Sequence, residues 1–388
     1  MSVTAAQGFR AAGLAAGIKA SGNPDLALVV NDGPLDVAAA VFTSNRFPAA
    51  PVIWSRQAVA DGAARAVILN SGGANACTGP QGFADSHEMA ERTASALRDG
   101  GMDIGAGDVL VCSTGLIGEL LPMERIRSGI DAAVAALTGS GGADAARAIM
   151  TTDSVPKTAQ VTTGGYTVGG MAKGAGMLAP SLATMLVVIT TDAVVDGDLA
   201  ETAVQVASSL TFDRIDSDGC MSTNDTVLLL VSGASGITPD PGSFTDAVTE
   251  VCADLARQLI ADAEGASKDI AITVRGAASE ADALEAARAI SRSNLLKCAI
   301  HGEDPNWGRI LAALGTTSAA FEADHVDVAI NGVWVCRSGG VGDPRDLVDM
   351  SQRLVRIEVD LAAGTFEATI LTNDLTAEYV HENSAYAT

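Results

Sequence analysis

Residues 169–189 read GGMAKGAGMLAPSLATMLVVI, a glycine-rich loop that runs directly into an apolar segment. Lys173 is the only charged residue of this stretch, and Thr184 stands where the apolar segment begins. A short apolar run bounded by turn residues is typical of a buried strand. We therefore expect a mixed α/β fold in which Thr184 opens a central strand and Lys173 lies on a neighbouring flexible loop.

Short apolar runs and helical spacings continue on both sides of this stretch. Residues 66–69 and 109–112 predict buried strands, because each run is continuous and apolar. Towards the C-terminus the predicted strands alternate in polarity, which indicates a separate, more antiparallel α+β unit from about residue 275 onward. The other predicted elements are helices over 126–137, 244–259 and 279–296, and strands over 326–337, 354–361 and 365–372.

Composition restricts the partners and the compartment. Asp and Glu total 47 against 24 Lys and Arg, so the net charge is −23. Such an acidic chain should repel nucleic acid and anionic membranes. The six cysteines form no CxxC pair, which argues against a disulfide framework or a structural zinc site. With neither a secretory signal nor a membrane span in the sequence, we expect a cytoplasmic protein that binds no metal.

Thr184 is a candidate nucleophile, although a threonine hydroxyl reacts only beside a base. The sequence has four histidines and no recognisable triad or nucleophile-elbow motif to supply one. Cleavage between Ala183 and Thr184 would create an α-amino group, which titrates at about pH 7.7–8.0 and can accept the hydroxyl proton. Thr184 could perform this cleavage itself by attacking the Ala183 carbonyl, giving fragments 1–183 and 184–388.

A purely structural interpretation of the same stretch stays open on pattern alone. Threonine is common at the start of strands, and Gly-Lys-Gly runs are common in turns. A phosphate-binding loop is disfavoured, because GGMAKGAG does not match GxxxxGK[ST] and precedes a strand instead of a helix.

The segment KGAGMLAPSLATML (173–186) closely resembles the self-processing site of the glutamate N-acetyltransferase / ornithine acetyltransferase family, the ArgJ proteins of arginine biosynthesis. The resemblance extends over essentially the whole chain, and so many ordered blocks make it specific. The other matching blocks are GIKASGNPDLAL (17–28), AVFTSNRFPAAPV (40–52), NSGGANACTG (70–79), CSTGLIGELLP (112–122), AIMTTD (148–153), STNDT (222–226), EGASK (264–268), DPNWGR (304–309) and HENSAYAT (381–388).

This resemblance implies an acyl exchange in cyclic arginine biosynthesis. Acetyl would move from N2-acetyl-L-ornithine to L-glutamate through an acetyl ester on Thr184. The family fold implies a four-layer αββα catalytic unit over residues 1–275 and a smaller α+β domain over 276–388. The two fragments would stay together, as a heterotetramer of two alpha and two beta chains. No cofactor is implied, and whether acetyl-CoA also donates acetyl to glutamate stays open.

The resemblance also assigns site residues. Thr114 and Gly115 match the residues that form the family's oxyanion hole. Loss of one hydrogen-bond donor from such a hole typically raises the activation free energy by about 2.7–4 kcal/mol. Without the family, residues 113–115 would be interpreted as a turn that ends a strand. The positions that match substrate-binding residues are Thr151, Lys173, Thr184, Glu264, Asn383 and Thr388. Ala387 stands where the family often has a hydroxyl residue, so this departure bears on the contacts of the tail.

Two other functions compete with the transferase. One is a self-processed, threonine-dependent amidase or aminopeptidase that passes the acyl group to water. The other is a non-enzymatic, ligand-binding α/β protein in which Thr184 is structural. Acetate release at full rate without glutamate would favour the hydrolase over the transferase. A chain that stays full-length would favour the binding protein.

Overall fold

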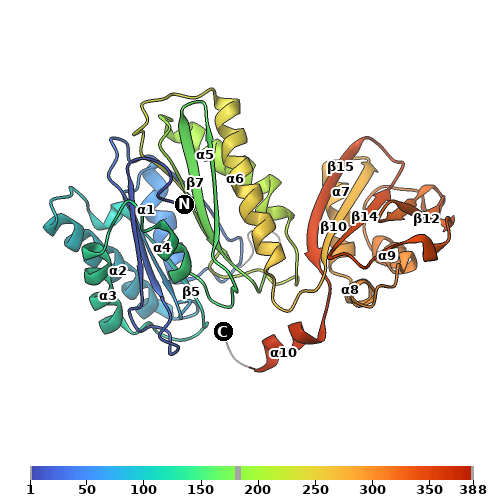
Figure 1. Cartoon of the computed structure of the whole chain (residues 1–388), viewed down its shortest axis with the longest axis horizontal. Helices are drawn as coiled ribbons and strands as arrows, with labels where there is room; N and C mark the ends of the chain where they lie inside the picture. Colours follow the sequence, from blue (N-terminus) through green and yellow to red (C-terminus); the bar gives the residue numbers. More distant parts are fainter. Residues whose placement is uncertain (1, 180–184, 386–388) are drawn as a thin grey trace.

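The computed structural model describes residues 2–179 and 185–385, which form three β-sheets (Figure 1). Two of these sheets are built from residues before 232. The first has the order β1-β2-β4-β5, with β1 (Phe9–Leu14), β2 (Leu26–Asn31), β4 (Ala66–Ser71) and β5 (Val109–Thr114). The second has the order β3-β9-β8-β7-β6, with β3 (Ala38–Phe42), β9 (Thr226–Val231), β8 (Leu186–Thr191), β7 (Tyr166–Lys173) and β6 (Lys157–Thr163).

These two sheets pack face to face through one apolar core. Val67 and Leu69 of β4 belong to the same buried cluster as Leu186 and Val188 of β8. Helices cover the two outer faces: α2 (Gly79–Asp99) and α3 (Met123–Ala135) lie on the first sheet, and α5 (Gly197–Leu210) and α6 (Pro241–Ala261) lie on the second. The predicted mixed α/β fold is confirmed, and its layers run helix, sheet, sheet, helix (Figure 1).

This layering explains the continuous apolar runs of the central strands. A strand between a helix layer and a second sheet is buried on both faces, so alternate polar residues would be desolvated. Every residue of β8 and of β9 is buried, and the same is true of β2, β4 and β5. The predicted buried strands at 66–69 and 109–112 are therefore correct.

The third sheet contains the C-terminal strands, whose polarity alternates. In β14 (Leu354–Asp360) buried positions alternate with exposed or half-buried ones, because helices pack on one face of this sheet. Its first strand starts at Asp269, ahead of the domain boundary that we predict at residue 275. The strand order is β13 (Gly340–Val341), β12 (Val333–Arg337), β11 (Asp327–Ile330), β14, β10 (Asp269–Ala277) and β15 (Phe366–Asn373).

The prediction of one helix over 279–296 is wrong. The chain forms α7 (Glu280–Ser291) and then a new helix, α8 (Asn294–His301), with α9 (Trp307–Leu314) following. Ser293 has extended backbone angles, and its hydroxyl accepts a hydrogen bond from the Leu296 amide. A serine N-cap of this kind starts a helix, so the continuous apolar spacing conceals a break.

Three further helices complete the fold: α1 (Ala50–Ala58), α4 (Gly142–Ala148) and α10 (Ala377–Ala385). Figure 1 shows α10 leaving the third sheet and running back below the strand ends of the two stacked sheets. None of the helices in the described ranges combines the length and apolarity that crossing a membrane requires. The last helix thus returns a C-terminal segment to the edge where β5 and β7 end.

Candidate active site

A cavity of about 130 Å³ lies at this edge of the stacked sheets. It is lined by Thr114, Gly115, Thr151, Thr152, Lys173, Gly176, Met177, Glu264 and Asn383. Six predicted site residues therefore meet around one cavity: Thr114, Gly115, Thr151, Lys173, Glu264 and Asn383. Their chemical roles stay predictions. The other three predicted positions, Ala183, Thr184 and Thr388, lie outside the described residues.

Strand ends bring these residues together. β5 ends at Thr114, and β7 ends at Lys173, which pairs with Leu186 at the start of β8. Met185 is buried just ahead of β8, and its carbonyl accepts a hydrogen bond from the Thr226 amide of β9. The residue that precedes Met185 in the chain is Thr184. Covalent connection alone thus places the predicted nucleophile next to this anchored strand end.

The turn after β5 requires glycine and presents a polarised hydroxyl. Gly115 has φ +129°, and a Cβ there would lie 2.6 Å from the Gly73 nitrogen. Residues 72 and 73 approach this closely because both amides donate to the Thr114 carbonyl, at 2.8 and 3.0 Å. Lys173 Nζ donates to Thr114 Oγ1 at 3.3 Å, which leaves the Thr114 hydroxyl proton free to be donated to a ligand.

Lys173 is a buried cation, not a solvated loop charge. Lys173 is only 2% exposed, and this burial lowers the pKa of its ammonium group. The nearby carboxylate of Asp153 opposes that effect. Burial by itself would raise the pKa of Asp153, but Lys173, Lys157 and the Thr151 amide together hold that pKa at about 2. Asp153 is therefore ionised at neutral pH and compensates the lysine charge.

Asp153 also fixes the backbone around the cavity. Its carboxylate accepts hydrogen bonds from the Thr151 amide at 2.9 Å and from the Gly174 amide at 2.7 Å. Lys157, which is fully buried, bonds Asp153 at 2.6 Å and Asp262 at 2.5 Å. This ionic network ties the loop of Thr151 to the end of β7. It positions Thr151 and Lys173 in the wall of the same cavity.

The remaining wall comes from the loop after α6 and from α10. The Asn383 side chain donates to Glu264 Oε2 at 2.9 Å. Close packing holds α10 here, because Gly265 has φ +60° and a Cβ at this position would lie 2.3 Å from the Tyr379 nitrogen. The Thr376 hydroxyl donates to the Gly265 carbonyl at 2.7 Å. Glu264 thus receives a neutral donor and lacks a paired cation among the described residues.

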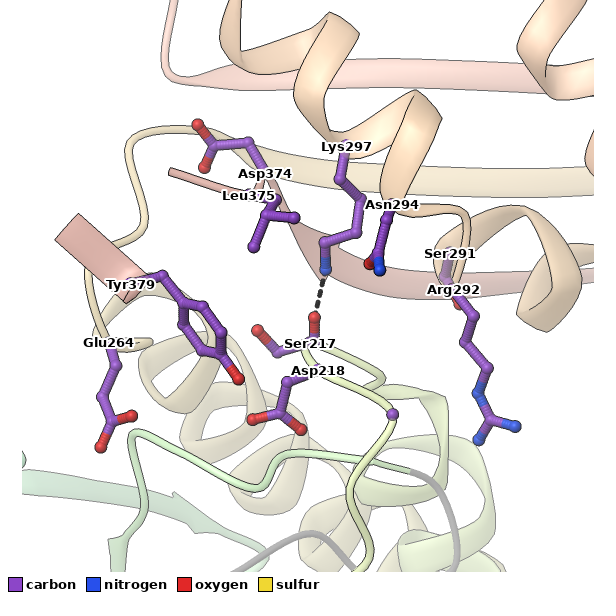
Figure 2. A pocket seen from close by; sticks show the side chains of 11 residues that line it. Ser217, Asp218, Glu264, Ser291, Arg292, Asn294, Lys297, Asp374, Leu375 and Tyr379 are labelled. Carbon is purple, nitrogen blue, oxygen red and sulfur yellow. Dashed lines mark hydrogen bonds between the residues drawn. The ribbon is translucent and has the colours of Figure 1, made fainter. Parts of the chain in front are cut away.

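A second cavity of about 230 Å³ adjoins the first and shares Glu264 with it. Figure 2 shows Lys297 of α8 reaching toward the Ser217 carbonyl, to which its ammonium group donates, while Tyr379 and Asp218 face each other below. Burial lowers the pKa of Lys297. Glu264 therefore lies on a wall that two cavities share, between the stacked sheets and the C-terminal unit.

Sequence reasoning missed two residues that hold the strand ends. Asn224 donates to the Ser113 carbonyl at 2.8 Å and to the Ala74 carbonyl at 2.6 Å, which links the second sheet to the first. Asp225 accepts the Met185 amide at 3.0 Å. Both belong to the STNDT block at 222–226. The available signal was an acidic residue placed directly ahead of the apolar run 226–231.

Comparisons with known proteins agree with the resemblance of the motifs. The family model described as the ArgJ family matches residues 10–388. The "Arginine biosynthesis bifunctional protein ArgJ" of Streptomyces avermitilis is 66% identical, and that of Streptomyces coelicolor is 64% identical, each over 387 residues that cover 100% of both chains.

Two solved structures also match. The ornithine acetyltransferase complexed with ornithine from Mycobacterium tuberculosis is 58% identical and covers 48% of this chain and 96% of its own, with a TM-score of 0.46. The arginine biosynthesis bifunctional protein ArgJ from Bacillus halodurans is 34% identical and covers 51% of this chain and 98% of its own, with a TM-score of 0.49. On the family model and its full-length relatives, the chain belongs to the ArgJ family of arginine-biosynthesis acetyltransferases.

Proposed function

We propose that this chain cleaves itself between Ala183 and Thr184 and then moves acetyl from N2-acetyl-L-ornithine to L-glutamate through an acetyl ester on Thr184. The observation that carries the proposal is the convergence of six predicted site residues on one cavity beside Met185. Those residues lie up to 269 positions apart in sequence, between Thr114 and Asn383, so chance spacing does not explain their meeting. Family membership supplies the reaction class.

Self-cleavage needs a reactive peptide bond between two fixed ends. Upstream, the Leu178 carbonyl accepts the Ser217 amide at 2.5 Å; downstream, Met185 is bonded through both its amide and its carbonyl. In the proposed reaction the Thr184 hydroxyl attacks the Ala183 carbonyl carbon, and the peptide nitrogen leaves as the Thr184 amine. Water then hydrolyses the resulting ester, which yields the Ala183 carboxylate and restores the hydroxyl.

The transfer uses the same hydroxyl with the new amine as its base. The Thr184 hydroxyl adds to the acetyl carbonyl, ornithine leaves with the proton that the amine accepted, and glutamate attacks the acetyl ester in the second half. Thr114 and Gly115 would donate to the oxyanion of each tetrahedral intermediate. A covalent intermediate lets the two amino acids use one site in turn.

Charge complementarity supports the two proposed substrates. Lys173 offers a buried cation to the α-carboxylate that ornithine and glutamate share. Glu264, which forms no ion pair in the described ranges, suits the side-chain ammonium of ornithine. The reaction uses a side-chain nucleophile, so we propose that no cofactor is needed.

The relatives' names describe them as bifunctional, and on that ground we also propose glutamate acetylation from acetyl-CoA.

Thr114 and Lys173 would belong to the first fragment, and Glu264 and Asn383 to the second. Because each fragment contributes to the cavity, both must stay associated, which supports an assembly of two alpha and two beta chains.

Mass spectrometry of the purified protein combined with a transfer assay tests the proposal. We expect fragments 1–183 and 184–388, and ornithine formation from N2-acetylornithine that depends on glutamate. Thr184→Ala should stay full-length and inactive. A cleaved Thr184→Ala variant would contradict the mechanism, and acetate release at full rate without glutamate would identify a hydrolase instead.

A further inference from the structure

We propose that Asp225 is a positioning residue for the cleavage-site threonine: it anchors Met185 and offers an unpaired carboxyl oxygen to the amino group that cleavage releases. This inference rests on the proposed self-cleavage and deepens it. Asp225 is not among the site residues that the family resemblance assigns, although its block, STNDT (222–226), matches the family in sequence.

Asp225 lies directly beside the predicted cleavage site. It precedes β9, and because Leu186 pairs with Thr226 in parallel register, Asp225 stands next to Met185. Asp225 Oδ1 accepts the Met185 amide at 3.0 Å, and the Thr226 amide donates to the Met185 carbonyl at 3.1 Å. One residue of backbone spans at most about 3.6 Å. Because Thr184 is bonded directly to Met185, we infer that the amine released on Thr184 forms near this carboxyl.

The other oxygen of this carboxyl lacks a partner. Asp225 is 0% exposed, yet its Oδ2 makes no well-formed hydrogen bond to any atom that the structure describes, although the Ser222 hydroxyl favours the charged form of this carboxyl. A buried polar atom left unsatisfied costs about 1–3 kcal/mol, so native proteins keep few of them. Those that remain call for an explanation, such as a partner that arrives later. A newly formed amine is a partner of the required kind, because it can both donate and accept.

Burial sets the charge of Asp225 before cleavage. It raises the pKa of this carboxyl well above its usual value, although the Met185 amide, the Lys173 charge and the Ser222 hydroxyl all favour ionisation. Burial therefore disfavours the ionised form of this carboxyl in the uncleaved chain. Once the amine exists, it can donate an N–H to Asp225 Oδ2, which leaves the nitrogen lone pair free to accept the Thr184 hydroxyl proton. Asp225 would then hold the amine and raise its pKa.

A second buried aspartate at the opposite end of β8 shows what a purely structural role looks like. Asp192 is 1% exposed and uses both oxygens, accepting the Thr167 amide at 2.7 Å and the Gln7 amide at 2.9 Å. Asp192 therefore needs no further partner. The two residues share burial, residue type and a place at an end of the same strand, so Asp192 is a matched control.

The test compares Asp225→Asn with Asp192→Asn and the wild-type full-length protein. Asparagine keeps an acceptor for the Met185 amide but cannot carry the negative charge. We expect Asp225→Asn to cut itself at least about 10-fold more slowly, or to transfer acetyl about 100-fold more slowly once cut. In the cut variant the acidic limb of kcat/KM should move about one unit to lower pH, because the amine loses a neighbouring carboxylate.

Asp192→Asn should change neither the cleavage rate nor the pH profile. A folded Asp225→Asn protein with wild-type rates and an unmoved acidic limb would overturn the inference. If Asp225→Asn does not fold, Asp225→Glu decides, since it keeps the charge but displaces it: a rate at least about 10-fold lower supports positioning, and a wild-type rate overturns it. A wild-type chain that neither cuts nor transfers would instead overturn the proposed function together with this inference.

Discussion

Asp153 and Asp225 are both buried carboxyl groups near Lys173, and they have opposite protonation behaviour. Asp153 accepts four hydrogen-bonding contacts from Lys157, Gly174 and Thr151, and its pKa is held at about 2. Asp225 accepts the Met185 amide with one oxygen only, and its pKa is raised well above the usual value. Burial raises the pKa of both carboxyls, so the difference between their pKa values comes from their partners.

Asp153 and Asp225 therefore have different functions in the same site. A satisfied carboxylate gives a fixed negative charge, and Asp153 uses it to bond Lys157 and to compensate the charge of Lys173. A carboxyl with one unpaired oxygen can still accept a hydrogen bond from a donor that forms beside it. Groups whose environments push their pKa values apart are typical of acid–base sites. Substituting these aspartates and their partners one at a time tests this difference.

Asp153→Ala should have the largest effect, on stability. It removes the counter-charge of Lys173 and one of the two carboxylates that bond Lys157, and leaving a buried charge without its partner costs about 3–5 kcal/mol. The urea midpoint of the folded protein, compared with wild type, measures this loss. Asp144→Ala is the control, because its pair with Arg147 is exposed and should contribute less than about 1 kcal/mol. Equal, small losses in the two variants would contradict the proposed importance of the network.

Lys173→Met removes the neighbour that both aspartates share. It deletes the donor to Thr114 Oγ1 and the proposed cation for the substrate carboxylate, so kcat/KM for N2-acetylornithine should fall about 100- to 1000-fold. Lys268→Met is the control, since this buried lysine bonds Glu303 in the C-terminal unit. It should lower stability but leave transfer within about 10-fold of wild type. Transfer by Lys173→Met at a wild-type rate would remove Lys173 from the site.

The pH dependence of stability should show the two aspartates with opposite signs. The pKa of Asp153 is depressed, so its contribution is present above the unfolded pKa of about 3.9 and is lost as the pH falls toward 2, about 2.6 kcal/mol in all. The pKa of Asp225 is raised, so its contribution is present at low pH and is lost as the pH rises through the folded pKa.

The Thr184→Ala background, which should stay uncleaved, isolates the Asp225 contribution. Adding Asp225→Asn should change the unfolding free energy by an amount that grows with pH, about 1.4 kcal/mol per unit from pH 4 up to the folded pKa of Asp225. Denaturant unfolding between pH 2 and 8 measures it. A difference between the two variants that stays constant with pH would mean that Asp225 is ionised before cleavage.

The sequence predicts the importance of Lys173 better than that of Asp225. Lys173 and the strand after it stand out locally, because a lysine among glycines followed by an apolar run is unusual. The charge state of Asp225 depends on β8 and β9 lying in parallel register, which is a tertiary fact. The link from Asn224 to Ser113 likewise joins residues 111 positions apart in sequence. By contrast, the break between α7 and α8 was readable from Ser293, a local N-cap signal.

Asn383→Ala should have the smallest effect and extends the comparison to a carboxylate that water reaches. Glu264 is only half-buried. Its Oε2 accepts a hydrogen bond at 2.9 Å from the side chain of Asn383, which lies on the exposed helix α10. Losing a hydrogen bond there costs about 1 kcal/mol, so KM for N2-acetylornithine should rise about 5-fold while kcat stays unchanged. Ser384→Ala on the same helix should change neither constant. A large fall in kcat for Asn383→Ala would mean that α10 orders the reacting groups themselves, and that Glu264 depends on its partner as strictly as Asp153 does.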